Sequence, residues 1–352
     1  MLTQTARRWT ADFELARPGV HAVFDHSKID GHWQSLAEMG WLGLTVPEEF
    51  GGMGGTVLDA CLVVEALSEY LNPLPFVGNA LIAALALQRV EGARYDEDLA
   101  ALAAGTRRFS LTVGDDLRWP PRPDSRVHYA WEWTPGDTVL APHSDGFVKL
   151  DSKTVTPFVG QDPLRSLGQL SAVSPSGVPD HNTKMMMEAV ANVATSAALI
   201  GTMAGVLNLT VEYVRSREQF GKAIGSFQAV QHMCSEMLVD LESSRSIVYA
   251  AAALLEKGDP LQAARFAATA KAWCAPASVR VTERAVQLHG GIGITWECDA
   301  HLYLRAAHLW SAAFGGELEA LDTVASLSDA EDHARNNTST VSRGGVGKET
   351  RT

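Results

Sequence analysis

Apolar residues recur at three- and four-residue spacing through the first part of the chain. Residues 29–39, 57–71 and 78–90 each carry this pattern, and Pro and Gly residues separate them. Because this spacing places apolar side chains on one face of a helix, the pattern predicts amphipathic helices. Residues 1–107 are therefore expected to form an N-terminal helical domain, with the apolar stripe at 62–67 facing its core.

The pattern changes to short alternating runs over residues 108–184. Residues 109–113 alternate, and the apolar runs at 138–142 and 147–150 flank a turn sequence at 143–146, which predicts a hairpin. A shortened, small central β domain is expected here. Long helices are excluded because prolines interrupt the segment, at positions 120, 121, 123, 135, 142, 157 and 163.

Helical spacing returns after residue 184 over much longer segments. Successive long helices predict a C-terminal four-helix bundle over 185–327. The tail at 328–352, rich in polar residues and glycine, is expected to be disordered. The predicted fold class is therefore mixed α and β, with three parts in the order helical, β and helical. The expected bundle helices cover Met185–Val214, 226–257, 260–289 and a segment that starts near Glu297 or Asp299.

Composition narrows the classes of function. The chain has 352 residues, of which 46% are hydrophobic, and this is enough for a core of several layers. No window approaches about eighteen uninterrupted apolar residues, and the first residues lack a signal-peptide core, so no membrane span or secretion is expected. The four cysteines lack close-pair spacing, which favours reduced thiols, a cytoplasmic protein and no metal site. The net charge of −12 argues against a nucleic-acid partner.

Two distant segments carry residues suited to one anionic ligand. The first reads Arg217-Glu218-Gln219-Phe220-Gly221-Lys222 and is followed by Gln228, and the second reads Gln287-Leu288-His289-Gly290-Gly291-Ile292-Gly293. An arginine, two carboxamides and a glycine-paired backbone can hold a pyrophosphate and its neighbouring sugars. Either segment alone is also compatible with a helix-end salt bridge or a glycine C-cap, so it is the pair that indicates a site.

In this order and spacing, the two segments resemble the acyl-CoA dehydrogenase flavoprotein family. Residues 41–52 look like the turn between the early helices of that family, and residues 295–305 are similar to the entry to its last helices. The resemblance covers roughly residues 25 to 325 and implies the same three-part order. It also implies FAD as the cofactor, an acyl-CoA thioester as the substrate and an electron-transfer flavoprotein as the usual electron acceptor.

The resemblance further implies which residues reach across a subunit interface, because each FAD of the family lies between two subunits. The arginine would supply a permanent forked cation, the phenylalanine would shield the adenine, and the carboxamides would bind sugar or phosphate oxygens. The glycines would let the backbone approach closely. The residues assigned to cofactor binding in this way are Arg217, Phe220, Gln228, Gln287, Gly290 and Gly291.

The half-site that the chain's own β domain would supply departs from the family. Relatives carry a Thr-Glu segment followed by Gly-Ser-Asp under the flavin, whereas residues 111–116 read Leu-Thr-Val-Gly-Asp-Asp. Trp119 could stack on a flavin, although a lone Trp among prolines is more often a core residue. His289 is interpreted as structural, since a His beside a helix end often caps carbonyls. The chain is therefore expected to lend half of a site and to own no complete one.

The catalytic base of the family is also missing. Dehydrogenation needs a desolvated carboxylate that removes the α-proton while the β-hydrogen leaves as hydride to the flavin. Alignment puts Gly315 where most relatives carry this Glu. Some relatives carry it on the first bundle helix, at positions that here fall near Ala191 and Asn192, neither of them basic. The remaining candidates are Glu188, about one helical turn away, and Glu317.

Three hypotheses follow. In the first, the chain is a subunit of a heteromeric acyl-CoA dehydrogenase, similar to the α2β2 enzymes of actinobacterial steroid side-chain breakdown, and a partner chain supplies the base. In the second, it is a self-sufficient homo-oligomeric dehydrogenase with a relocated Glu, and in the third a flavin-free structural partner. Retention of Arg217, Gln228 and Gln287 weighs against the third, and loss of the base weighs against the second.

Overall fold

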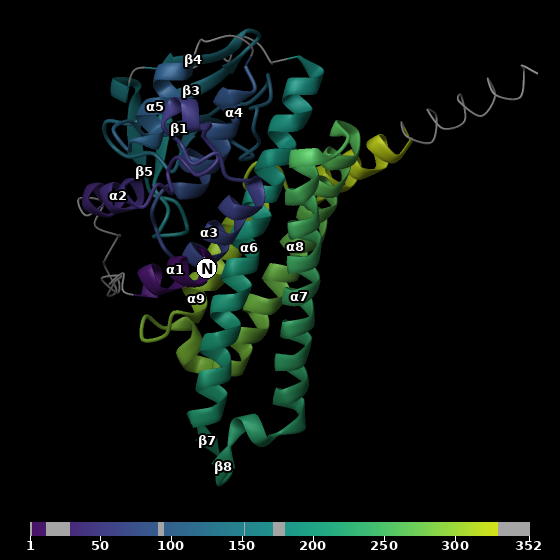
Figure 1. Cartoon of the computed structure of the whole chain (residues 1–352). Helices are drawn as coiled ribbons and strands as arrows, with labels where there is room; N and C mark the ends of the chain where they lie inside the picture. The colour runs from purple at the N-terminus through teal and green to yellow at the C-terminus, as the bar shows by residue number, and fades with distance from the viewer. Residues whose placement is uncertain (1, 12–28, 91–94, 151, 172–179, 330–352) are drawn as a thin grey trace, which may run out of the picture.

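The computed structural model describes residues 2–11, 29–90, 95–150, 152–171 and 180–329. Figure 1 shows a sheet and short helices gathered at one end of the molecule and long helices that extend away from them. This arrangement confirms the predicted mixed fold of helical, β and helical parts. Most of the predicted disordered tail lies outside the described residues, whereas Ser328 and Asp329 continue a helical segment at 317–329.

The N-terminal part is helical, as the apolar spacing predicts. A capping box begins α3, because Thr56 Oγ1 accepts from the backbone N–H of Asp59 while the Asp59 carboxylate accepts from the N–H of Thr56. The third predicted helix is a π-helix followed by a short α-helix, and almost every residue in it is buried. The elements are α1 (Leu2–Ala11), α2 (Ile29–Glu38), η2 (Glu48–Phe50), α3 (Val57–Glu69), η3 (Val77–Ala83), α4 (Ala84–Gln88) and α5 (Asp96–Ala103).

The central part is one six-stranded sheet in the order β4-β3-β1-β2-β6-β5. The predicted hairpin is present, with His143 paired to Gly146 across its turn. β1 and β3 are parallel, and every other neighbouring pair in this sheet is antiparallel. The strands are β1 (Phe109–Gly114), β2 (His128–Trp131), β3 (Thr138–His143), β4 (Gly146–Leu150), β5 (Val155–Phe158) and β6 (Leu167–Leu170), with η5 (Ser152–Thr154) before β5.

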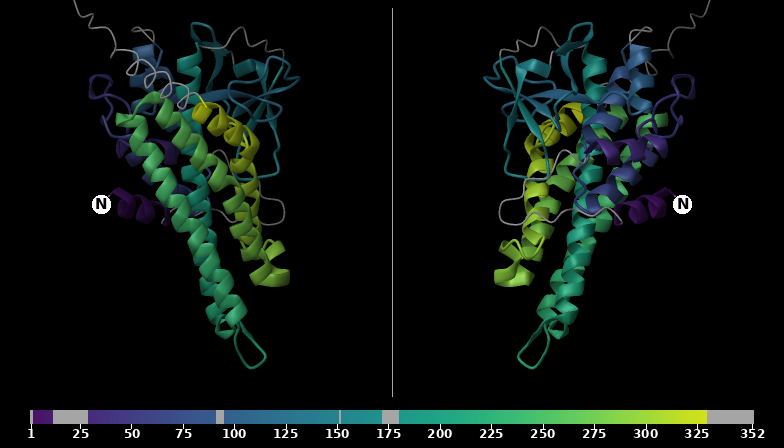
Figure 2. Two further views of the ribbon diagram at one scale, coloured as in Figure 1. Left: turned by 90° about the vertical axis from the view of Figure 1, so that its right-hand side faces the viewer. Right: turned by 90° about the vertical axis from the view of Figure 1, so that its left-hand side faces the viewer.

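Long helices form the C-terminal part, and Figure 2 shows them running side by side in two further views. α6 begins four residues before the predicted start at Met185, because Asp180 caps it and accepts from the N–H groups of Asn182 and Thr183. A small hairpin joins α6 to α7 at the far tip of the molecule. The elements are α6 (His181–Ser216), β7 (Glu218–Gln219), β8 (Lys222–Ala223), η6 (Ile224–Ser226), α7 (Gln228–Lys257), α8 (Pro260–His289), η7 (Gly290–Ile294) and α9 (Ala300–Ala312).

The helix α6 is long and apolar enough to cross a membrane by length and composition, although polar residues interrupt its apolar runs. Its most apolar window is 94% buried inside the protein. α3, α7, α8 and α9 all pack against it. Its apolar character therefore matches its position as the central helix of the bundle.

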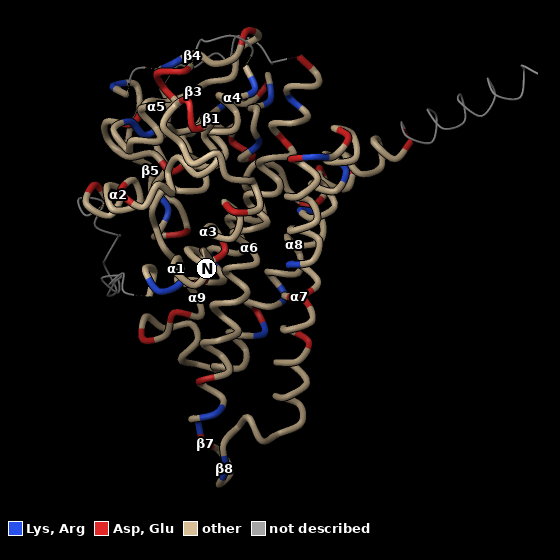
Figure 3. Tube along the Cα trace, viewed as in Figure 1, with Lys and Arg blue, Asp and Glu red and all other residues tan. Residues whose placement is uncertain are grey.

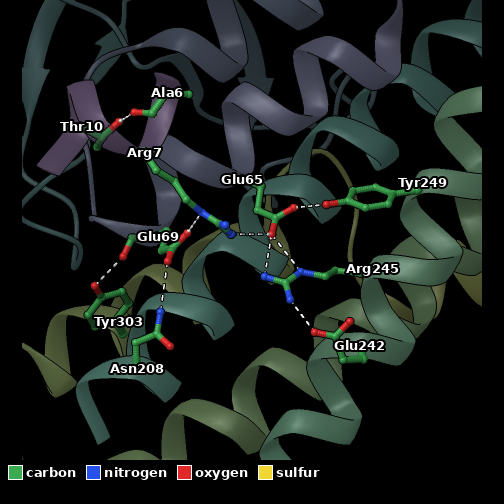
Figure 4. Close-up of polar contacts among 10 residues, drawn as sticks. All are labelled: Ala6, Arg7, Thr10, Glu65, Glu69, Asn208, Glu242, Arg245, Tyr249 and Tyr303. Carbon is green, nitrogen blue, oxygen red and sulfur yellow. Dashed lines mark hydrogen bonds and ion pairs between the residues drawn. The ribbon is translucent and has the colours of Figure 1, made fainter. Parts of the chain in front are cut away.

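A buried ion cluster fastens α1 and α3 to the bundle (Figure 4). Glu65 has only 1% of its surface exposed. Its carboxylate accepts from Nε and Nη2 of Arg245, at 2.9 and 2.8 Å, and from the hydroxyl of Tyr249. Arg7 of α1 lies 3.7 Å from Glu65 and donates to Glu69 at 2.6 Å. Buried carboxylates need such partners, since an unpaired buried charge is strongly unfavourable.

A second buried junction joins the three parts of the fold. Glu132 follows β2 and accepts from the N–H of Gly78 in η3 at 2.9 Å. Arg165, in the loop before β6, lies 3.9 Å from Glu132 and donates to the carbonyl of Asn72 at 2.6 Å. Its guanidinium also lies over the ring of Trp310 in α9, 5.2 Å from the centroid. This loop therefore ties the sheet to both helical parts.

Candidate functional site

The sequence-predicted cofactor residues lie at one end of the bundle, away from the sheet. Arg217 directly follows α6, Phe220 forms the tip of the β7–β8 hairpin, and Gln228 begins α7. The other three residues are at the end of α8. All six are exposed to solvent, and Phe220 is 90% exposed. We call these six residues the trans site: Arg217, Phe220, Gln228, Gln287, Gly290 and Gly291.

The hairpin that carries Arg217 is held in a defined shape. The N–H of Arg217 donates to the carbonyl of Tyr213, and the carbonyl of Arg217 accepts from the N–H of Ile224, both at 2.8 Å. Phe220 and Gly221 turn the chain with positive φ angles of 54° and 79°. Basic residues are present at this tip, as Figure 3 shows. No ion pair of Arg217 occurs within the described part of the chain, so its guanidinium is available to an anionic ligand.

The end of α8 presents open backbone to the same region. Gly290 ends the helix with φ 64°, a conformation that favours glycine. A Cβ atom built on Gly290 or Gly291 would meet no heavy atom within 4 Å. By contrast, a Cβ on Gly293 would approach His289 to 2.9 Å, so the missing side chain there lets η7 fold against α8. The trans site is therefore an open surface with a cation and with glycines that leave room for a ligand, which fits the phosphate end of FAD.

Gly315, at which the family resemblance places the base, lies away from the trans site. It lines a cavity of about 590 Å³ near the sheet. Its walls come from residues 118–123 after β1, the first turns of α6, the start of α8 and the segment that follows α9. Glu188, Asn192 and Gly315 all line it. The structure therefore brings together Gly315 and Asn192, which match the two positions at which members of the resembled family carry a base.

Gly315 has φ 113°, a backbone conformation that residues with a side chain rarely adopt. Glu188 pairs with Lys184 at 3.7 Å, and burial raises the pKa of its carboxyl. Glu317 is exposed and is not among the residues that line this cavity. Of the two candidate carboxylates, only Glu188 faces the cavity.

Glu319 also lines the cavity, and sequence reasoning missed it. Its Oε2 accepts from the N–H of Gly316 at 3.0 Å, while its Oε1 lies 2.7 Å from Nη2 of Arg118. A Glu three residues after a glycine that precedes a helix is a capping signal, and this spacing could have identified it. The ion pair compensates the negative charge of Glu319 and links the last helical segment to the loop after β1.

The chain's own side of this cavity does not fit a flavin stacked on Trp119. Trp119 is 1% exposed, and its ring stacks on Phe147 and meets the edge of Phe314, with centroids 6.4 and 6.1 Å away. The two acidic residues after β1 also have partners. Asp116 pairs with Arg122 at 3.2 Å, and Asp115 accepts from a backbone N–H at 3.3 Å. Trp119 is thus a core residue, which was the ordinary interpretation of its sequence context.

Comparisons with known proteins agree with the fold. Residues 181–325 match the acyl-CoA dehydrogenase C-terminal domain, and residues 1–90 match the acyl-CoA dehydrogenase N-terminal domain. Acyl-CoA dehydrogenase IpdE2 of Mycobacterium tuberculosis is 34% identical to 81% of this chain and 82% of its own length.

Solved structures are also similar over nearly the whole chain. A variant of the Tcur3481-Tcur3483 steroid ACAD has 26% identity and a TM-score of 0.79, over 95% of this chain and 98% of that one. The ChsE4-ChsE5 complex from Mycobacterium tuberculosis has 24% identity and a TM-score of 0.74, over 92% and 96% of the two chains, and shows the fold alone.

Proposed function

The chain belongs to the acyl-CoA dehydrogenase family, FAD-dependent oxidoreductases of acyl-CoA thioesters, and we propose that it is the base-free subunit of a heteromeric member. One observation carries this proposal. Every residue of the trans site is exposed at one end of the bundle, whereas the chain's own cavity presents Gly315 where the family would place its base. An exposed phosphate site remote from its own cavity suits a ligand whose other end lies in a partner chain.

In this proposal the chain's residues bind and orient the cofactor. Arg217 pairs with the pyrophosphate, Gln228 and Gln287 bind sugar or phosphate oxygens, and Phe220 covers the adenine. Gly290 and Gly291, which carry no side chain, would leave room for the phosphates beside the backbone. FAD, when bound, supplies the hydride acceptor, and the partner chain supplies the carboxylate that removes the α-proton.

The proposed assembly is an α2β2 heteromer with an acyl-CoA substrate and an electron-transfer flavoprotein as electron acceptor, located in the cytoplasm. Similarity to a steroid ACAD whose name joins two components supports both the second chain and a bulky, ring-bearing CoA thioester. The substrate class rests on that analogy, because function follows the site and not the fold.

Flavin content tests the proposal. The chain is purified alone and again co-expressed with a candidate catalytic subunit, and FAD is measured by absorbance. No FAD on the chain alone, together with about one FAD per heterodimer, is the expected result for a shared site. Full FAD on the lone chain would overturn the proposal that a different chain completes the FAD site. Absence of FAD from both preparations would favour a flavin-free structural partner.

A self-sufficient dehydrogenase is the second candidate function, and the position of Glu188 favours it. This carboxylate lines the cavity beside Gly315, and its raised pKa suits a general base. The lone chain, reconstituted with FAD, would then oxidise an acyl-CoA, and Glu188→Gln would abolish the turnover. Glu317→Gln is the matched control, since Glu317 is exposed and lies outside the cavity lining.

A further inference from the structure

Tyr213 and His289 connect the two segments of the trans site. Tyr213 lies in the last turn of α6, and His289 is the last residue of α8. Their rings stack with centroids 4.4 Å apart and an interplanar angle of 22°. The Tyr213 hydroxyl also donates to the carbonyl oxygen of His289 at 3.3 Å. One tyrosine thus contacts both the ring and the backbone of the residue that ends the neighbouring helix.

Each member of this pair is bonded to a ligand-binding segment. On one side, the Tyr213 carbonyl accepts from the N–H of Arg217 at 2.8 Å, one helical turn later. On the other side, His289 is followed directly by Gly290, whose N–H donates to the carbonyl of Gln287. The His289 ring is itself held by a bond between Nδ1 and the carbonyl of Ala285 at 2.8 Å. The pair therefore connects the segment that carries Arg217 to the segment that carries Gly290.

We propose that Tyr213 is a positioning residue, which sets the separation between Arg217 and the Gly290–Gly291 backbone so that both reach one pyrophosphate. This inference rests on the proposed function of the trans site. The two segments lie on different helices, and both are exposed where they would meet the ligand. Without a connection between them, binding would have to order one segment relative to the other, which weakens affinity.

The test measures FAD affinity by fluorescence titration of the apo heteromer, with thermal unfolding recorded in parallel. Tyr213→Leu, which removes both the stack and the hydroxyl, is expected to weaken FAD binding about tenfold or more. Tyr213→Phe keeps the ring and is expected to lose less. Tyr70→Leu is the matched control, because Tyr70 is a partly exposed tyrosine at the end of α3. The FAD affinity of this variant should equal that of the wild type.

A double-mutant cycle separates positioning from general stability. Tyr213→Leu and Arg217→Lys are combined, and the two losses should not add, because a misplaced segment already weakens the contact that lysine changes. Unchanged FAD affinity in Tyr213→Leu, or losses that add fully, would overturn the positioning role. A different result would show that the trans site does not bind FAD at all. In that case Arg217→Ala would leave FAD occupancy unchanged, with either residue at position 213.

Discussion

Glu188 and Gly315 line one cavity from two different elements, the first turns of α6 and the segment after α9. These are the two places where a base is expected in the family, and the chain has a carboxylate near one and a glycine at the other. Gly315 has a backbone conformation that disfavours any residue with a side chain. A glutamate at this position would therefore strain the turn. Of the two carboxylates proposed as a relocated base, Glu188 and Glu317, only Glu188 lines this cavity.

Arg217→Ala is expected to strip FAD from the heteromer. It removes a permanent forked cation from an exposed phosphate site, and the loss of a charge-assisted contact of about 1.5–3 kcal/mol corresponds to roughly ten- to hundredfold weaker binding. The measurement is the ratio of flavin to protein absorbance after desalting. Arg215→Ala, two residues earlier on α6 and also exposed, should retain its flavin. Full occupancy in the Arg217 variant would contradict the pyrophosphate role.

Glu317→Ala and Glu188→Gln are both expected to leave turnover of the heteromer near that of the wild type, because the proposed base is in the partner chain. The measurement is the steady-state rate with an acyl-CoA and an artificial electron acceptor. A loss beyond about a hundredfold in either variant would move the base to this chain. Of these two glutamates only Glu188 lines the cavity, so such a loss confined to Glu188→Gln would establish the self-sufficient alternative.

Glu65→Gln is expected to destabilise the fold by about 3–5 kcal/mol, because Arg245 and Arg7 would keep their charges around a neutral side chain. Urea unfolding measures this change in free energy. Glu242→Gln is the matched control, since Glu242 pairs with the same Arg245 but its side chain is 55% exposed. Its effect should stay below about 1 kcal/mol. Equal losses in the two variants would show that burial of Glu65 is not the cause.

Glu132→Gln is expected to gain stability relative to the wild type as the pH rises. Burial raises the pKa of Glu132 to about 7, and nearby Asp162 adds to this, although Arg165 and the Gly78 N–H act in the opposite direction. Between the ordinary pKa of 4.5 and about 7, the folded state then binds more protons than the unfolded state. Wild-type stability therefore falls with rising pH in this window, and the glutamine variant lacks that loss.

The check for Glu132 is the difference in melting temperature between variant and wild type at pH 5 and pH 8. The difference should shift in favour of the variant at the higher pH. Glu97→Gln, on the exposed side of α5, should show no such shift. A difference that is the same at both pH values would mean that Glu132 is ionised throughout, held so by Arg165.

Local signals predicted much of the fold. The Asp259-Pro260 start of α8 and its end at His289 appear at the predicted positions, because capping residues and glycine act over a few neighbours. The β3–β4 hairpin follows its turn sequence for the same reason. The apolar spacing predicts a start at Met185, whereas α6 begins at His181, because the Asp180 cap adds a polar first turn.

What a side chain contacts was harder to predict. Nothing in the local sequence distinguishes Glu65, which meets two arginines from other helices, from an ordinary helix-surface carboxylate. The role of Tyr213 was also missed, because its partner lies 76 positions later in the chain. Likewise, the sequence signals that Glu319 caps a helix, but not that it pairs with Arg118 in the loop after β1.

The sequence by itself determined the order of helical and β parts and the ends of most long helices, because these depend on residue type and short-range spacing. The expectation of a glycine in place of the catalytic Glu, at Gly315, came from the family resemblance. Only the tertiary structure decided that Glu188 shares a cavity with Gly315 and that Tyr213 stacks on His289. Those relationships arise where helices pack side by side, and packing brings together residues whose separation along the chain carries no information about their distance in space.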